Sequence, residues 1–150
     1  MIPESRARPG RVLRDRGLTL FGQAPVKLNL GAGNADTLIG ALLAANFNVT
    51  TDQSITLPTG LWRITRILVT NASLNMTTAV GGFYDAASKG GNAVVAATQV
   101  YSALTSATVT LSCTIAAPAD WNVSTTLFFA LTTAQGAAAT AAIRIYGVRL

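Results

Sequence analysis

Apolar and polar residues alternate with a period of two along most of the chain after residue 48. The clearest run is VTLSCTI, which would place Val109, Leu111, Cys113 and Ile115 on one side and threonine and serine on the other. This is the spacing of side chains on one face of a β-strand, and short runs bounded by Gly, Asn and Pro turns are typical of antiparallel sheets. The pattern predicts an all-β fold, an antiparallel β-sandwich of jelly-roll-like form, with an immunoglobulin-like sandwich as the alternative.

Other stretches carry the same alternation or interrupt it. It recurs in NVTTDQSITLP, TLFFALTT and AAIRIYGVRL, and in LWRITRILVTN it changes phase, which predicts a β-bulge near Thr65–Arg66. The stretch ADTLIGALLAA (35–45) fits either a helix capped by Asp36 or a buried strand. A helical turn is expected within residues 94–107, and VKLNL (26–30) predicts a short strand that the turn GAGN follows.

The N-terminal segment differs from the remainder in charge. Charged residues make up only 11% of the chain, yet five of its 11 basic residues fall in the first sixteen positions, opposed by Glu4 and Asp15. Pro and Gly break any regular element there. We therefore divide the chain into an extended basic N-terminal arm (1–25) and a β-sandwich domain (26–150). Arginine forms forked bonds to carboxylates and phosphates, and an apolar pair within the arm favours a protein groove over nucleic acid. The predicted partner-binding residues of the arm are Arg6, Arg8, Arg11, Val12, Leu13, Arg14 and Arg16.

Residues for catalysis or metal binding are few. The chain has no histidine and a single cysteine, Cys113, which the alternation places on an apolar face as a buried structural thiol. Glycine-rich GAGNAD and SKGGN lack the spacing of nucleotide-binding loops and predict a turn and a hairpin loop. We expect no enzyme activity, no catalytic residue, no metal and no cofactor. Beyond the arm the acids lie singly beside predicted turns, at Asp36, Asp52, Asp85 and Asp120.

Two further ligand classes are weighed. The longest apolar run, LIGALLAANF (38–47), is about half as long as a membrane span requires, so no membrane span is expected. Large aromatic residues more often build a core or a subunit interface than a sugar platform. A carbohydrate-binding platform therefore stays a secondary hypothesis for Trp62, Trp121, Phe83, Tyr84, Tyr101 and Tyr146.

Three long segments carry a family resemblance. They are RITRILVTNASLNMTTAVGG (63–82), GGFYDAASKGGNAVVAATQVYSALTSATVTLS (81–112) and LFFALTTAQGAAATAAIRIYGVRL (127–150). Together they resemble small tailed-phage and prophage virion structural proteins of the type found in phages of alphaproteobacteria. The resemblance covers residues 26–150, carries no catalytic signature, and implies a virion part built as a jelly-roll homotrimer. The arm is not part of that pattern.

The expected function combines the arm with this resemblance. We expect a capsid decoration or cementing protein on the capsid surface of a virion, present in the host cytoplasm during assembly. It would dock as a homotrimer through the arm onto the major capsid protein or another virion protein. The alternatives are a head, collar or tail fibre or spike component, and a carbohydrate-binding module that contacts the host surface.

Overall fold

The all-β prediction is confirmed by the computed structural model, which describes residues 35–116, 120–122 and 125–150. Every strand pairing is antiparallel. No helix occurs among these residues, and accordingly none with the length and apolarity to cross a membrane. The strands are β1 (Thr37–Asn46), β2 (Gln53–Thr56), β3 (Leu61–Thr70), β4 (Val80–Ala86), β5 (Gly90–Val95), β6 (Leu111–Ser112), β7 (Asp120–Asn122), β8 (Thr126–Thr133) and β9 (Thr140–Arg149).

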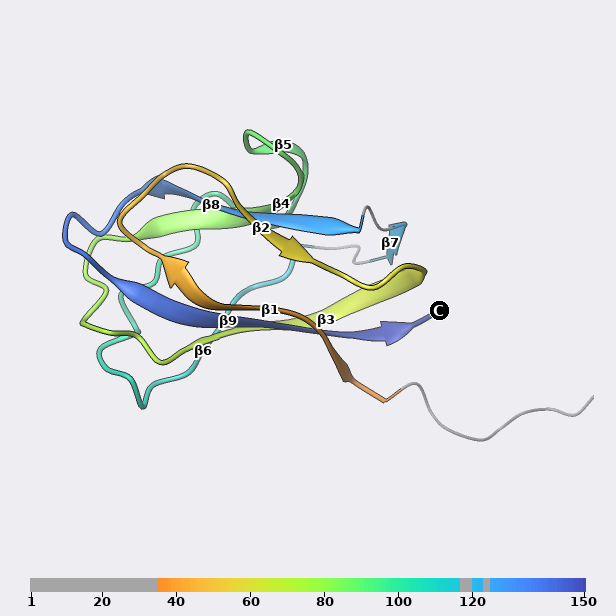
Figure 1. Ribbon diagram of the computed structural model, residues 1–150, viewed down its shortest axis with the longest axis horizontal. Coiled ribbons are helices and arrows are strands. Elements are labelled where there is room, and N and C mark those ends of the chain that lie inside the picture. The colour runs from red at the N-terminus through yellow and green to blue at the C-terminus, as the bar shows by residue number, and fades with distance from the viewer. Residues whose placement is uncertain (1–34, 117–119, 123–124) are drawn as a thin grey trace, which may run out of the picture. The chain divides into compact units, whose positions relative to one another are not determined.

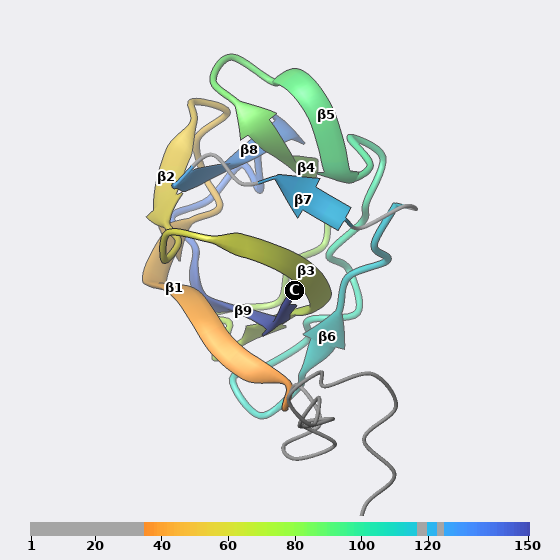
Figure 2. The same cartoon turned by 90° about the vertical axis from the view of Figure 1, so that its right-hand side faces the viewer.

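The strands form two sheets. One has five strands in the order β1-β9-β3-β6, with β7 also paired to β3, and the other has four strands in the order β2-β8-β4-β5. Figure 1 shows the two sheets as two layers, and Figure 2, turned by 90°, shows β1 and β2 at the same side of those layers. β1 is therefore the first strand in the order of one sheet, and β2 is the first strand in the order of the other.

The pairing of strands is nested. β1 pairs with β9, β2 with β8, β3 with β6, and β4 with β5. With β7 set aside, the first strand thus meets the last, the second meets the one before it, and so on inwards to the β4–β5 hairpin.

One hydrophobic core takes side chains from both sheets. Ile55 and Leu127 come from the β2-β8-β4-β5 sheet, and Ile67 and Ile143 from the other, all four at most 2% exposed. Four rings lie at its centre with centroids 5.0–6.1 Å apart, the distance range of favourable aromatic pairs: Phe47, Phe83, Tyr101 and Phe129. The alternate apolar side chains of β8 and β9 are buried, which confirms the predicted inward faces of these two segments.

A buried glutamine secures the loops at one end of the core. Gln135, 8% exposed, accepts hydrogen bonds through Oε1 from the backbone N–H groups of Thr78 (3.1 Å) and Ala79 (3.3 Å). Its Nε2 donates to the carbonyl of Asn75 at 3.1 Å, and its own N–H donates to the carbonyl of Phe47 at 2.8 Å. Because a buried amide is tolerated only when its polar atoms are paired, this set of bonds explains its position.

The predicted bulge in β3 is confirmed. The register of β3 against β9 shifts between Ile64 and Arg66, and both Ile64 and Ile67 are buried. An extra residue in one strand turns the following side chains to the opposite phase, so apolar residues stay in the core on both sides of the bulge.

The stretch that fitted either a helix or a strand forms strand β1 from Thr37 to Asn46, which settles that open alternative. It is also less buried than expected: Leu43 is 68% exposed, and β1 has one neighbour, β9, among the described strands of its sheet. Gly40 lets the strand approach the end of β2 closely, since a Cβ atom at that position would lie 3.2 Å from the carbonyl oxygen of Thr56 and 2.6 Å from Cδ2 of the following Leu57. The alternation was masked because two register shifts interrupt the pairing of β1 with β9.

For the region between β5 and β8, the expected helical turn is wrong, and the expected strand VTLSCTI is confirmed only in part. Residues 96–109 contain turns, including a hydrogen bond from the N–H of Leu104 to the carbonyl of Tyr101, in place of a helical turn. The run VTLSCTI alternates in burial as expected, but only Leu111–Ser112 is a strand. The chain there leaves one sheet for the other: Cys113 N–H donates to Ile67 of β3, and Ala116 N–H donates to Val94 of β5.

Candidate docking surface

The arm residues predicted to bind a partner, Arg6 to Arg16, lie outside the described residues. The structure therefore leaves the assignment of the arm as a prediction. It does describe the point at which the chain following the arm enters the body, because the described residues begin at Ala35 and β1 begins at Thr37.

A polar contact holds that entry point to the neighbouring strands. Asp36 accepts a hydrogen bond from the hydroxyl of Thr65 and forms an ion pair with Arg66, whose Nη2 lies 2.7 Å from Oδ2 of Asp36. The Arg66 guanidinium also lies over the ring of Tyr146, 4.5 Å from its centroid. The contact joins the start of β1 to β3 across β9, and we call Asp36, Thr65, Arg66 and Tyr146 the entry clamp.

The entry clamp adds little to the free energy of unfolding, and its main effect is to hold the chain in place before β1. The side chains of Arg66 and Asp36 are 46% and 36% exposed, so water and salt screen their attraction. Exposed ion pairs contribute at most about 1 kcal/mol, and a cation over an exposed aromatic ring adds a similar amount. The clamp instead fixes the position of residue 36, at the point where the chain enters β1.

The face of the β1-β9-β3 sheet that holds Arg66 and Tyr146 also carries other apolar and cationic side chains. Residues directly opposite each other share a face, and the register pairs Leu38 with Tyr146, Tyr146 with Arg66, and Arg144 with Leu68. Leu38 is 50% exposed, and Nη1 of Arg144 donates to the hydroxyl of Thr70 at 2.8 Å. We call this surface the docking face; its residues are Leu38, Arg66, Leu68, Arg144 and Tyr146.

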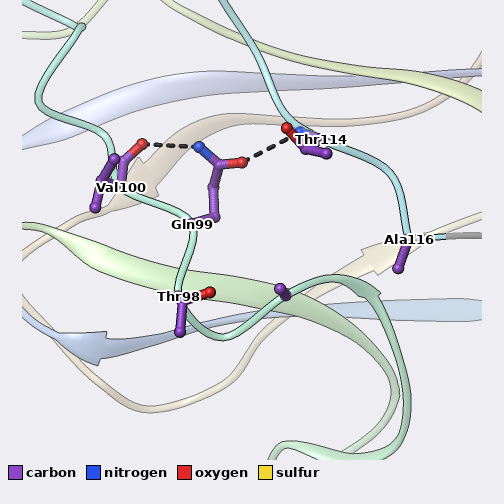
Figure 3. Close-up of a pocket in the computed structure, with 6 residues that line it drawn as sticks. Thr98, Gln99, Val100, Thr114 and Ala116 are labelled. Carbon is purple, nitrogen blue, oxygen red and sulfur yellow. Dashed lines mark hydrogen bonds between the residues drawn. The ribbon is translucent and has the colours of Figure 1, made fainter.

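A shallow hollow of about 320 Å³ lies elsewhere, between the loop after β5 and the segment after β6 (Figure 3). The amide of Gln99 crosses it: Nε2 donates to the carbonyl of Val100 at 2.8 Å, and Oε1 accepts from the N–H of Thr114 at 3.1 Å. The amide is therefore committed to the backbone on both sides. The lining residues are Ala96, Thr98, Gln99, Val100, Thr114 and Ala116.

Two of the predicted turn acids organise the β4–β5 hairpin. Asp85 accepts from the N–H of Asn92 at 2.7 Å and from its side-chain amide at 3.0 Å, while Asp52 accepts from the N–H of Ser88. Ser88 and Lys89 adopt positive φ angles of 59° and 57°, so SKGGN forms the tip of a hairpin as predicted. Among the described residues, no group of three or more His, Cys, Asp or Glu side chains is placed to hold a metal ion.

Two aromatic residues, Trp62 and Tyr84, have buried polar atoms that find no hydrogen-bond partner among the described residues. Trp62 packs against the core, and no described residue bonds to its Nε1. Tyr84 is 4% exposed; burial and then the nearby charge of Asp52 raise the pKa of its hydroxyl, which is also unpaired. The side chain of Trp121 lies outside the described residues, although its backbone pairs with Trp62.

Cys113 is the buried thiol that the alternation predicted. It is 5% exposed, and burial raises its pKa from 9.0 to about 12, while a hydrogen bond with Tyr101 lowers it in part. Because the folded pKa lies above the unfolded one, the stability that the thiol contributes is present below pH 9 and is lost as the pH rises towards 12.

We expect Cys113 to react with iodoacetamide at pH 8 roughly a thousandfold more slowly in the folded chain than in urea. The thiolate is the reactive form, and each pKa unit changes its population tenfold. Intact mass measured over time, with and without urea, checks this result. Equal rates in the two conditions would contradict the burial of the thiol.

Sequence reasoning missed the entry clamp. Asp36 was interpreted as a helix cap or turn residue, and nothing in the sequence connects it with Arg66, thirty residues later. Only the strand register, which places β9 between β1 and β3, brings the two side chains together.

No family model matches the chain, and no curated protein or solved structure is significantly similar to it.

Proposed function

We propose that this chain is a bacteriophage virion structural protein that decorates or cements the capsid and docks as a homotrimer through its arginine-rich arm. The arm supplies the charge for the contact, since its five arginines carry most of the net charge of +5. The body supplies a rigid support with a continuous core. The observation that supports the proposal is the entry clamp, because it holds residue 36 in place where the segment that follows the arm enters β1.

We further propose that the two sheets are the halves of a jelly roll. The nested pairing of β1 with β9, β2 with β8, β3 with β6 and β4 with β5 supports this topology. Jelly rolls combine two Greek keys in two sheets and recur in viral capsid and lectin domains. The fold alone does not decide between those functions, so the arm and its entry point bear the functional argument.

The docking face is the proposed contact between copies in the trimer. Interfaces are enriched in arginine and aromatic residues, and this face combines Arg66, Arg144 and Tyr146 with Leu38. Three arms on one body then bind a shell far more tightly than one arm does, because the first attachment raises the effective concentration of the others. The affinity of each arm can therefore be weak.

Replacing the five arm arginines by glutamine tests the proposal. The trimer measured by light scattering should persist, whereas sedimentation with phage particles that lack the protein should show no bound chain. Replacement by lysine keeps the charge and removes the forked bonds, so binding should be intermediate. Arg149→Gln, at an exposed position in the body, is the matched control and should bind fully. Unchanged binding of the glutamine variant would refute docking through the arm.

A further inference from the structure

Tyr84 is buried although it faces away from the core. The preceding residue in β4, Phe83, is 0% exposed in the core, and successive residues of a strand point to opposite faces. Tyr84 therefore lies on the outer face of the β2-β8-β4-β5 sheet, opposite Phe128 of β8 in the register. A side chain on an outer face normally meets solvent, yet Tyr84 is 4% exposed. A further layer of the chain therefore covers the sheet at this residue.

The tip of the β4–β5 hairpin reaches the same place. The N–H of Ser88 donates to the carboxylate of Asp52, and Nζ of Lys89 donates to the carbonyl of Thr50 at 3.2 Å. Burial, and then the charge of that Asp52 carboxylate, raise the pKa of the Tyr84 hydroxyl, so the carboxylate lies near it. Figure 2 shows the hairpin on the side of its sheet away from β9. The hairpin tip, the segment before β2 and Tyr84 thus meet on the outer face.

The hairpin tip has its own internal bonds and little burial. Asp85 accepts hydrogen bonds from the N–H of Asn92 at 2.7 Å and from its side-chain amide at 3.0 Å. The N–H of Gly90 donates to the carbonyl of Ala87 at 3.0 Å. Every residue from 86 to 92 is exposed or half-buried, so this segment holds its shape without entering the core. We call residues 86–92 the strap.

The pairing of β4 is irregular where the strap begins. The register of β4 against β8 runs as far as Tyr84 and Phe128. Against β5, the register of β4 shifts on both sides of Tyr84, between Phe83 and Tyr84 and between Tyr84 and Ala86. Such irregularities disrupt the hydrogen-bond ladder and bend a strand. The strap is therefore joined to the sheet through a bend.

We propose that the strap opens and closes as a unit over Tyr84 while the rest of the body stays folded, with Asp52 as its latch. Hydrogen bonds at exposed positions hold the strap to the segment before β2, whereas the adjoining strands are held by the core. Segments with few buried apolar contacts open far more often than a domain unfolds. Opening uncovers Tyr84 and Phe128 on the sheet face opposite the docking face. The inference goes beyond the proposed function, because it involves neither the arm nor a capsid.

Acetylation of tyrosine by N-acetylimidazole tests the proposal in the full, unmodified chain, with the modified residue located by peptide mass spectrometry. Tyr101, which is 0% exposed in the core, reports unfolding of the whole body. We expect Tyr84 to react at least roughly tenfold faster than Tyr101 in the folded chain, and at least roughly tenfold more slowly than in urea. Reaction of Tyr84 as slow as that of Tyr101 would mean that unfolding alone exposes it. Reaction as fast as in urea would mean that nothing covers it. Either result refutes the proposal.

A disulfide across the latch provides a matched comparison within one variant. The contact between Asp52 and Ser88 brings their backbones close enough for the bond in Asp52→Cys/Ser88→Cys. We expect Tyr84 to be acetylated at least roughly tenfold more slowly in the oxidised form than in the reduced form, because the closed strap can no longer open. Tyr101 is the reference in both forms.

Three results with this variant would overturn the proposal. One is a rate for Tyr84 that oxidation leaves unchanged, and another is a rate that falls no further than that of Tyr101. The third is failure of the disulfide to form in the folded chain, which would contradict the latch contact. If the double variant does not fold, the comparison of Tyr84 with Tyr101 in the unmodified chain decides the question.

Discussion

Replacing Phe129 with alanine should reduce the free energy of unfolding by about 3–5 kcal/mol, the range for removing a fully buried large aromatic side chain. The ring is 0% exposed and lies 5.0 Å from Phe47, 5.1 Å from Phe83 and 6.1 Å from Tyr101, measured between centroids. Its loss leaves a cavity where side chains of β4, β8 and two loops meet. Since small domains are stable by only about 5–15 kcal/mol, the variant should unfold at a much lower urea concentration.

The neighbouring Phe128 provides the matched control. It lies on the same strand, points to the opposite face and is half-buried. Phe128→Ala removes the same group, yet it should cost less than half as much because less apolar surface is buried there and no enclosed cavity forms. Equal losses for the two variants in urea unfolding followed by fluorescence would contradict the placement of the core between the sheets.

Gly82→Ala should be comparably damaging for the opposite reason, because there is no room for a side chain. A Cβ atom on Gly82 would lie 2.3 Å from the carbonyl oxygen of Val95 and 2.9 Å from the carbonyl carbon of Ala96. Both are backbone atoms, so relief requires β4 and the end of β5 to separate. We expect a loss of about 3 kcal/mol or more, at the upper end of overpacking effects.

Gly136→Ala is the comparison for that prediction. Nothing lies within 4 Å of a Cβ atom at Gly136, whose φ of 81° is the sole source of strain. The cost of placing alanine in that conformation is about 1–2 kcal/mol. Thermal unfolding of both variants by circular dichroism distinguishes them. A smaller loss for Gly82→Ala than for Gly136→Ala would contradict the close contact between β4 and β5.

The fold class followed from side-chain periodicity wherever a strand has one face in the core. In β8 and β9 the alternation is regular, and Leu127, Phe129, Ile143 and Ile145 are buried as expected. In β3 the change of phase predicted a bulge that the register confirms. These strands lie inside their sheets, where burial on one face imposes a strict period of two.

The strand β1 at a sheet edge, and the segment that passes from one sheet to the other, could not be predicted from side-chain periodicity. β1 has two register shifts and exposed leucines, so its sequence resembles a helix as much as a strand. The run around Cys113 alternates regularly but passes from one sheet to the other, and hydrogen bonding there leaves a strand of two residues. Periodicity reports which side chains face the core, and it carries no information about which backbone is the partner.

The candidate site, too, could be predicted from the sequence only in part. The charge of the arm is visible in the sequence, and its residues remain a prediction outside the described part of the chain. The entry clamp depends on the order β1-β9-β3, which brings Asp36 to Arg66.

The most direct test of the central claim, that the arm fastens a folded body to a shell, is the copy number of the chain in purified phage particles. Quantitative mass spectrometry should find the full-length chain in many copies, in a multiple of three, and should find none of the chain lacking residues 1–25, although that shorter chain folds. The same copy number for both chains, or no copies of the full-length chain, would contradict the account.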